Sequence, residues 1–371
     1  MKKILILGGG AAGLAAAVHA AQSGAQVTLA EKNERVGQKL LRTGNGRCNF
    51  TNLHVSDKAY NHPSFVRPVL EKWDAEAMRA FFAGLGLLSY EDPAGRVYPR
   101  SDAAASVLDV LRLACRRYNV ETVTGFDAAR LDGANVQARD GRTLSGDAIL
   151  VATGGGTQLL KSSGHRIVPF SPVLCPLKTD TAPIRGLSGI RVSCALRLTR
   201  GGKCIAEESG ELLFRDYGVS GIAVFDLSRF AKPGDMLHID LLPELSDAQA
   251  LALFRTRVQA LSWCSREEIL TGLFHKRVNE ALLRLAGTDA QKFARCAKDL
   301  SLTVEGPAEP KQAQLTRGGA DTAQFDPASM RSKLDARLFA AGEALDIDGR
   351  CGGFNLHWAF ASGLTAAENM L

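Results

Sequence analysis

The sequence lacks the features that mark disulfide-rich, metal-binding and repetitive proteins. Its eight cysteines include no Cys-x-x-Cys pair and no paired zinc-ligand spacing, so we expect neither structural disulfides nor a metal site. Scattered single cysteines are typical of a reducing compartment, where they pack as small apolar residues. We therefore expect a cytoplasmic protein without a bound metal.

A membrane-spanning run and a hydrolase nucleophile are also missing. Residues 4–30 carry no formally charged side chain, but glycines divide this stretch into a short apolar run and a helical pattern, which argues against a signal peptide or a membrane span. Ser220 lies in Gly-Val-Ser-Gly, yet position 222 is Ile, whereas a nucleophile elbow needs glycine there.

The composition is that of a globular protein with room for two or three domains. The 371 residues are 46% hydrophobic and 23% charged, and the formal net charge is +6. Basic residues gather in one stretch, which keeps an anionic partner open although a solvated strand edge is the simpler interpretation: Arg185, Arg191, Arg197, Arg200 and Lys203.

A strand–helix–strand pattern opens the chain. Residues 4–7 form an apolar run typical of a buried parallel strand, a helical pattern follows to Gln22, and Gly24 has the position of a C-terminal cap. Residues 25–30 then predict a second strand. This order is that of a Rossmann-type unit.

The turn inside this unit has the spacing Gly-x-Gly-x-x-Gly. Gly8 would permit the tight turn, Gly10 would let the backbone approach a pyrophosphate, and Gly13 would let the helix pack close to the strand. A helix N-terminus suits an anion because its N–H groups are unpaired and carry a partial positive charge. Glu31 follows at the distance where a carboxylate accepts hydrogen bonds from the adenosine ribose.

The next segment favours FAD over NAD. Residues 43–52 are rich in small and polar groups, and they follow the ribose carboxylate at the point where an extended FAD would pass toward the sheet edge. Gly44 and Gly46 would permit close backbone approach. A plain surface loop is the alternative.

Several phrases together resemble the FAD-dependent flavoproteins often called the YhiN or BaiN type, which are also labelled aminoacetone oxidase-like. The similarity runs from Lys2 to the C-terminus. It rests on GGGAAG at 8–13, TGNGRCNFTN at 43–52, ATGG at 152–155, FRDYGVSG at 214–221 and FAAGEALDIDGRCGGFNLHWAFASG at 339–363.

This resemblance implies a non-covalent FAD that both ends of the chain hold. Its final helix, begun by residues 353–356, would aim N–H groups at the pyrimidine edge of the flavin, where they would stabilise the negative charge of the reduced ring. The implied cofactor-binding residues are Gly8, Gly10, Ala12, Gly13, Glu31, Lys32, Gly37, Arg47, Cys48, Asn49, Ala152, Thr153, Gly154, Gly342, Glu343, Asp346, Gly353, Phe354, Asn355 and Leu356.

Two departures from the family pattern bear on activity. Residues 157–164 are shorter than the polar stretch that is common there, and Arg215-Asp216 stands where relatives often have Thr with His or Asp. The first leaves open a flavoprotein that has lost activity. The second implies a different substrate if that position faces it.

The middle of the chain predicts an inserted domain. Residues 190–242 and 301–312 have short β-like runs separated by Gly and Pro turns, which predicts a small antiparallel barrel, and residues 243–300 are helical. The fold class is therefore α/β: a Rossmann-like FAD domain of the glutathione-reductase or fumarate-reductase kind, formed by residues 1–189 and 313–371, with a cap domain at 190–312. The substrate would bind at their junction.

No single residue can be assigned as catalytic. Packing is the simpler role for Cys48 and Cys351, and a hydrogen-bonded structural role is the simpler one for His165 and His357. Arg215 and Tyr217 are weaker candidates for substrate binding.

The predicted function is that of an FAD-dependent oxidoreductase acting on a small organic substrate, with NADH, NADPH or oxygen as redox partner. No second Rossmann loop is present, so NAD(P)H would have to reach the flavin directly as a co-substrate. Reduction of an unsaturated or carbonyl compound is the first hypothesis, and amine oxidation is the next. The alternative from another class is an RNA-modifying or nucleic-acid-binding flavoprotein that uses the basic stretch. Substrate, donor and oligomeric state remain open.

Overall fold

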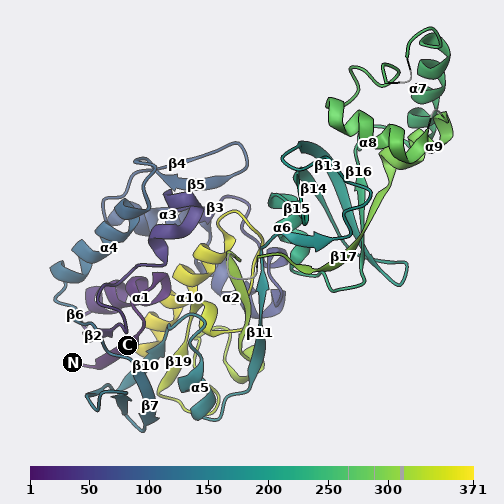
Figure 1. Ribbon diagram of the computed structural model, residues 1–371. Coiled ribbons are helices and arrows are strands. Elements are labelled where there is room, and N and C mark those ends of the chain that lie inside the picture. The colour runs from purple at the N-terminus through teal and green to yellow at the C-terminus, as the bar shows by residue number, and fades with distance from the viewer. Residues whose placement is uncertain (266, 288, 310–312) are drawn as a thin grey trace. The chain divides into compact units, whose positions relative to one another are not determined.

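A parallel sheet of five strands forms the centre of the part of the chain that contains both termini (Figure 1). Its order is β19-β10-β1-β2-β6, and every neighbouring pair is parallel. The strands are β1 (Lys3–Leu7), β2 (Gln26–Ala30), β6 (Glu121–Val123), β10 (Ala148–Val151) and β19 (Leu338–Ala340). Because β1 is covered on both faces, Ile4–Leu7 is at most 1% exposed, as its unbroken apolar run predicts.

The computed structural model describes residues 1–265, 267–287, 289–309 and 313–371. The chain divides into unit 1, which contains Met1–Ser171 and Thr316–Leu371, and unit 2, which contains Pro172–Leu315. Within the described residues, no helix is long and apolar enough to cross a membrane.

Three helices of unit 1 pack together beside the sheet: α1 (Ala11–Gln22), α4 (Ala104–Arg117) and α10 (Phe354–Met370). In Figure 1, α1 and α10 lie side by side. The other elements of unit 1 are η1 (Leu40–Gly46), β3 (Thr51–Asn52), η2 (Asp57–Ala59), α2 (Pro63–Lys72), α3 (Ala75–Gly84), β4 (Ser89–Glu91), β5 (Arg96–Pro99), β7 (Ala128–Asp132), β8 (Asn135–Ala138), β9 (Thr143–Ser145), α5 (Gln158–Ser162), η4 (Thr322–Gln324) and η5 (Gly342–Ala344).

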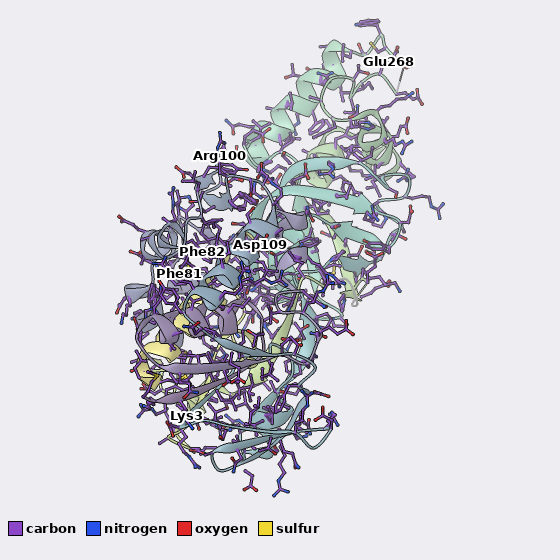
Figure 2. All side chains as sticks on the ribbon, turned by 90° about the vertical axis from the view of Figure 1, so that its left-hand side faces the viewer. Lys3, Phe81, Phe82, Arg100, Asp109 and Glu268 are labelled. Carbon is purple, nitrogen blue, oxygen red and sulfur yellow. The ribbon has the colours of Figure 1, made fainter. Side chains whose placement is uncertain are left out.

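An aromatic cluster joins these elements in the core. Phe82, labelled in Figure 2, contacts the rings of Phe50 and Phe360 with centroids 4.9 Å away in each case, and all three side chains are 0% exposed. Such tilted and edge-on pairs contribute about 0.5–1.5 kcal/mol beyond the burial of area. The cluster fixes α10 against α3 and against the segment that leads into β3.

A closed antiparallel barrel forms the strand part of unit 2, with the order β12-β15-β14-β13-β16-β17. Its strands are β12 (Leu177–Thr179), β13 (Arg191–Arg200), β14 (Lys203–Arg215), β15 (Gly218–Ser220), β16 (Met236–Asp240) and β17 (Leu300–Pro307). The helices of this unit are α6 (Ile222–Ser228), α7 (Asp247–Ala260), α8 (Lys276–Ala286) and α9 (Ala290–Lys298). Ser246 begins α7 through a reciprocal capping box with Gln249.

The unit boundaries differ from the predicted division at residues 189/190 and 312/313. Unit 2 begins at Pro172, because the short strand β12 pairs with β15 and β17 and so belongs to the barrel. The two-stranded sheet of β11 (Ile167–Val173) and β18 (Leu315–Ala320) contains both places where the chain passes from one unit to the other.

Candidate functional site

Three glycines shape the turn between β1 and α1, each for a different reason. Gly8 has φ of +107°, and a Cβ there would lie 2.4 Å from the carbonyl oxygen of Ala152. A Cβ on Gly13 would lie 1.9 Å from the carbonyl oxygen of Gly8, so the helix packs directly on the turn. A Cβ on Gly10 would meet no protein atom within 4 Å. Gly10 therefore borders open space at a helix N-terminus, which is where a pyrophosphate would approach.

Glu31 follows β2, and its carboxylate is directed back to this turn. The residue is 8% exposed, and Oε2 accepts a hydrogen bond from the backbone N–H of Gly9 at 2.7 Å. Oε1 accepts one from the backbone N–H of Asn33 at 2.9 Å. These bonds fix the carboxylate beside the glycine turn, whereas Lys32 is exposed.

The beginning of α1 meets the segment that precedes α10. A Cβ on Gly363 of α10 would lie 2.3 Å from the carbonyl oxygen of Ala12, so the two helices approach closely. Ala12 also lies 3.3 Å from where a Cβ on Gly342 would be, and the Gly342 N–H donates to Ser362 Oγ at 2.9 Å. The opening turn and the closing segment are thus neighbours in the folded chain.

Glu343 connects the 152–156 loop with Lys39. Lys39 Nζ lies 2.5 Å from Glu343 Oε2, and a Cβ on Gly154 would lie 3.7 Å from the same oxygen. Thr153 Oγ1 donates to the carbonyl of Gly156 and so closes the loop on itself. The sequence prediction missed Lys39, because its contact lies 304 positions away along the chain.

Residues 49–52 lie against the start of α10. Gly353 caps this helix with φ of +104°, and a Cβ there would lie 2.6 Å from the Thr51 carbonyl oxygen and 2.7 Å from Asn49 Oδ1. Asn52 Nδ2 donates to the Gly352 carbonyl at 2.8 Å. Asn49 is 7% exposed, and its Oδ1 has no hydrogen-bond partner among the described residues. A buried acceptor therefore remains free beside the N-terminus of α10.

Arg47 and Cys48 have different surroundings although they are adjacent. Arg47 stacks over the Tyr98 ring at 4.3 Å and pairs with Asp102 at 2.8 Å. Hydrogen bonds from Tyr90 and then Arg47 lower the pKa of Asp102. Cys48 is 0% exposed, and burial raises the pKa of its thiol to about 12, so it is neutral and packed rather than reactive.

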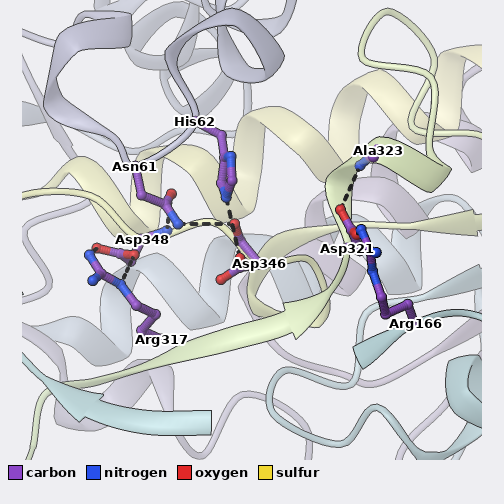
Figure 3. A network of polar contacts seen from close by, with 8 residues as sticks. All are labelled: Asn61, His62, Arg166, Arg317, Asp321, Ala323, Asp346 and Asp348. Carbon is purple, nitrogen blue, oxygen red and sulfur yellow. Dashed lines mark hydrogen bonds and ion pairs between the residues drawn. The ribbon is translucent and has the colours of Figure 1, made fainter. Parts of the chain in front are cut away.

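Asp346 belongs to a polar network that joins the closing segment to residues 61–62 (Figure 3). Asn61 Nδ2 donates to the Asp346 carbonyl at 3.1 Å, and His62 Nε2 lies 3.3 Å from Asp346 Oδ2. Arg317 makes two bonds to Asp348, at 2.6 and 2.9 Å, and Asp348 is 0% exposed. Asp346 itself is 8% exposed, and its Oδ1 has no hydrogen-bond partner among the described residues.

For other predicted site residues, contacts within the protein account for the residue type, either through packing or through loop structure. Gly37 is close to α4, since a Cβ on it would lie 2.2 Å from Leu108 Cδ1. Asn355 accepts from the Gly349 N–H at 2.7 Å and donates to the Gly349 carbonyl at 3.0 Å. Phe354 packs edge-on against Tyr60, whereas the side chain of Leu356 is only partly buried. Their contact with a cofactor stays a prediction.

His357 and His165 are buried and use both ring nitrogens within the protein. His357 contacts Thr51 Oγ1 at 2.7 Å and the Trp73 carbonyl at 2.8 Å, and burial lowers its pKa to about 4. His165 contacts the Leu160 carbonyl and Ser332 Oγ, and burial lowers its pKa as well. Both residues therefore have the structural role that the sequence analysis favours.

Two of the five basic residues in the basic stretch of unit 2 form ion pairs with acidic neighbours. Arg191 pairs with Glu211 at 2.5 Å, and Arg200 makes two bonds to the buried Asp235. Arg197 lies opposite Glu207 in the β13–β14 register. The predicted strand edge is wrong, because β13 pairs with both β14 and β16 in the closed barrel, but the ion pairs of Arg191 and Arg200 agree with a solvated surface.

These residues fit an extended dinucleotide cofactor. They provide open space at Gly10, a fixed carboxylate at Glu31, and a buried free acceptor at Asn49 beside a second helix N-terminus. A glycine turn alone would fit any dinucleotide, but here the closing segment lies against that turn. Within the described part of the chain, no group of three or more His, Cys, Asp or Glu side chains could hold a metal ion.

Comparison with known proteins identifies the family. Residues 2–369 match the family described as "HI0933-like protein Rossmann domain". The chain belongs to this family. The match covers nearly all of the sequence, so both units are part of the family fold.

Two relatives match over almost their full length. A 3-dehydro-bile acid delta(4,6)-reductase from Clostridium scindens is 35% identical over 404 residues, which cover 99% of this chain and 98% of the relative. A ribosomal RNA dihydrouridine synthase from Escherichia coli is 26% identical over 397 residues, which cover 99% of this chain and 97% of the relative. A solved flavocytochrome c3 fumarate reductase has a TM-score of 0.49 and 14% identity, covering 100% of this chain and 78% of that chain.

The predicted family and fold class are confirmed by these findings, as is the enzyme class, an FAD-dependent oxidoreductase. The Rossmann-type domain with a closed barrel and helices agrees with the predicted architecture.

Proposed function

We propose that this HI0933-like protein reduces a carbon–carbon double bond conjugated to a carbonyl group in a small organic substrate. NADPH or NADH would supply the reducing equivalents directly at a non-covalently held FAD. The names of both relatives support this reaction class, because a delta(4,6)-reductase and a dihydrouridine synthase each form a product with a double bond reduced.

One structural observation supports the proposal: the start of α1 lies against Gly342 and α10, so the opening glycine turn and the closing segment are neighbours. The N-terminus of α1 at Gly10 would hold the pyrophosphate, and Glu31 would accept hydrogen bonds from the ribose hydroxyls. The 17-residue helix α10 begins next to Asn49, and we expect its N-terminus to face the flavin end of the bound cofactor. Partial positive charge at that terminus would stabilise negative charge on a bound ring.

A bound flavin would supply hydride transfer at its N5 atom. The chain would provide binding, orientation and an environment of low water content around it. A carbonyl conjugated with the double bond makes the β-carbon electrophilic, so this substrate class suits a hydride donor. The predicted site residues would bring the flavin and the substrate together.

Anaerobic stopped-flow spectroscopy tests the proposal. The FAD-loaded protein should lose its yellow colour when mixed with NADPH or NADH, and the colour should return when a conjugated enone such as 4-androstene-3,17-dione or cyclohex-2-enone is added. If neither nicotinamide bleaches the flavin, NADPH and NADH are excluded as the electron donor. If neither enone restores the colour, conjugated enones are excluded as the substrate class. Denaturation should release the yellow colour into the supernatant if the FAD is non-covalent.

A further inference from the structure

His62 and Asp346 form a pair that the binding of FAD does not by itself explain. Asp346 lies between Glu343 and Gly353, in the segment that joins the two predicted flavin contacts. Its carboxylate is buried, with Oδ1 free of partners among the described residues and Oδ2 at 3.3 Å from His62 Nε2. The His62 side chain is 39% exposed, so its ring joins a buried carboxylate to an accessible surface.

The pair has a rigid support (Figure 3). Asn61, the neighbour of His62, donates to the Asp346 carbonyl, and its Oδ1 accepts from the Asp348 N–H at 2.9 Å. The Asn61 N–H donates to the Asp348 carbonyl at 3.0 Å, and Arg317 holds the Asp348 carboxylate with two bonds. The two segments that carry His62 and Asp346 are therefore fixed relative to each other.

Other histidines of unit 1 lack this combination of carboxylate partner and exposed ring. His165 and His357 are buried with both ring nitrogens bonded to protein, and His19 pairs with Glu368 at 3.6 Å near the end of α10. His54 is exposed and has no carboxylate bonded to its ring among the described residues. Cys48 is excluded as an acid by its burial.

We propose that His62 is the proton donor of the reduction, positioned by Asp346; this inference rests on the proposed function. Reduction of a conjugated carbonyl compound needs a hydride at the β-carbon and a proton at the α-carbon. In the step, the π bond of the substrate breaks and its β-carbon takes the hydride from reduced flavin, which is oxidised. The α-carbon takes the proton from Nδ1 of the His62 imidazolium. The neutral ring then regains a proton from water at its exposed edge.

The asymmetry of the pair suits this role. A bond from Nε2–H to Asp346 fixes the ring orientation, which leaves Nδ1 as the donor. Asp346 is a positioning residue, because it acts through His62. The ring nitrogens are assigned from this geometry.

The experiment separates the two half-reactions. FAD-loaded protein is reduced with dithionite without oxygen, and its reoxidation is followed with cyclohex-2-enone, 4-androstene-3,17-dione or oxygen. In His62→Gln, we expect reoxidation by enone to slow by about 100-fold or more, since general acids contribute about 10²–10⁴. Reoxidation by oxygen and reduction by nicotinamide should each change less than about threefold, because neither protonates a substrate carbon.

Three further variants make the result specific. His54→Gln, an exposed histidine of the same segment, should behave as wild type. Asp346→Asn should slow the enone step by about 10-fold. Imidazole in solution should partly restore the rate of His62→Ala, which a merely structural role would not allow. Flavin content and thermal unfolding establish that each variant is folded.

The failure of the proposed function and the failure of the proton-donor role give different results. If wild type is not reoxidised by either enone, the proposed function fails and this inference fails with it. If wild type is reoxidised and His62→Gln is equally fast, the proposed function stands and the proton-donor role is overturned. An equal slowing of the enone, oxygen and nicotinamide reactions would also overturn it, because that pattern indicates a displaced cofactor.

Discussion

At the scale of single residues, Gly10 differs from its neighbours in the same turn. Positions 8 and 13 need glycine because a Cβ on Gly8 or Gly13 would clash with protein atoms, whereas Gly10 faces open space. Protein packing does not account for glycine at position 10, so the reason lies in what approaches from outside. A negatively charged pyrophosphate at the helix N-terminus meets that requirement.

This difference predicts separate effects on binding and on folding. Gly10→Ala should lower FAD affinity at least about 10-fold, because the added methyl group enters the space for the pyrophosphate. The apo protein should lose only about 1 kcal/mol, the usual cost of alanine at a helix N-cap. Titration of apo protein with FAD, followed by fluorescence, and thermal unfolding measure the two quantities.

Gly84→Ala is the matched control for Gly10→Ala. Gly84 also has open space around its Cβ position, but it lies at the end of α3. FAD affinity should be unchanged there. Equal affinities for Gly10→Ala and wild type would contradict the assignment of the pyrophosphate position.

The residues that the sequence could predict are those whose neighbours are close along the chain. Gly13 and Glu31 follow from one strand–helix–strand unit, because each contacts a partner within that unit, whereas the close neighbour of Gly8 is Ala152 in another segment. His62 and Lys39 find their partners in the closing segment. No local pattern indicates such a contact, so these two residues could be found only in the folded structure.

At the scale of elements, His357 ties α10 to two other segments. Its ring contacts Thr51 in β3 and the Trp73 carbonyl at the end of α2, so the N-terminal turn of α10 is fixed from both sides. The ring is neutral in the folded protein, since burial lowers its pKa to about 4.

Because the His357 ring is neutral in the folded protein, we expect the free energy of unfolding to fall in acid. The unfolded chain takes up a proton near the ordinary pKa of about 6.5, whereas the folded chain does so only near pH 4. The free energy of unfolding should therefore fall as pH is lowered through this range, by up to about 3 kcal/mol. Urea unfolding at about pH 7 and pH 5 should show a fall of about 2 kcal/mol from His357 in wild type.

His357→Gln should lose this part of the pH dependence, although it should also be less stable at neutral pH. His54→Gln should keep it, because His54 is exposed. The same pH dependence in His357→Gln and wild type would show that other groups cause the loss. His19 and His165, whose pKa values burial also lowers, would then be next to test.

The boundaries of some elements could not be predicted from sequence patterns. Long strands such as β13 and helices such as α7 follow from their patterns and caps. The three-residue strand β12 has no signal of its own, since only pairing with β15 and β17 makes it a strand. For this reason the predicted start of the inserted domain at residue 190 lies 18 residues after Pro172, where unit 2 begins.

At the scale of the whole molecule, the net charge of +6 gives little information on partners, because Arg191 and Arg200 of the basic stretch are already ion-paired within unit 2. The Arg191–Glu211 pair follows from the pairing of β13 with β14 and the Arg200–Asp235 pair from that of β13 with β16, and the sequence alone supplies neither pairing. An RNA-modifying function is therefore not favoured, although one relative acts on ribosomal RNA according to its name.

This pairing predicts little salt-dependent binding of RNA. Gel shifts with a ribosomal RNA fragment at about 50 and 200 mM salt should show weak binding at both, since few unpaired cations are available to release counterions. The variant Glu211→Gln frees Arg191 and should bind more tightly at low salt. Tight wild-type binding that weakens steeply with salt would reopen the RNA-modifying alternative.

The central sheet also has a consequence for the order of biosynthesis. Strand β10 is complete at Val151, but its neighbour β19 begins at Leu338, after all of unit 2. A ribosome-bound chain would therefore hold an unpaired, apolar β10 edge for as long as the intervening barrel is being made, whereas the barrel could already close. Nascent unit 1 should thus depend on chaperones that shield exposed strands until translation passes β19.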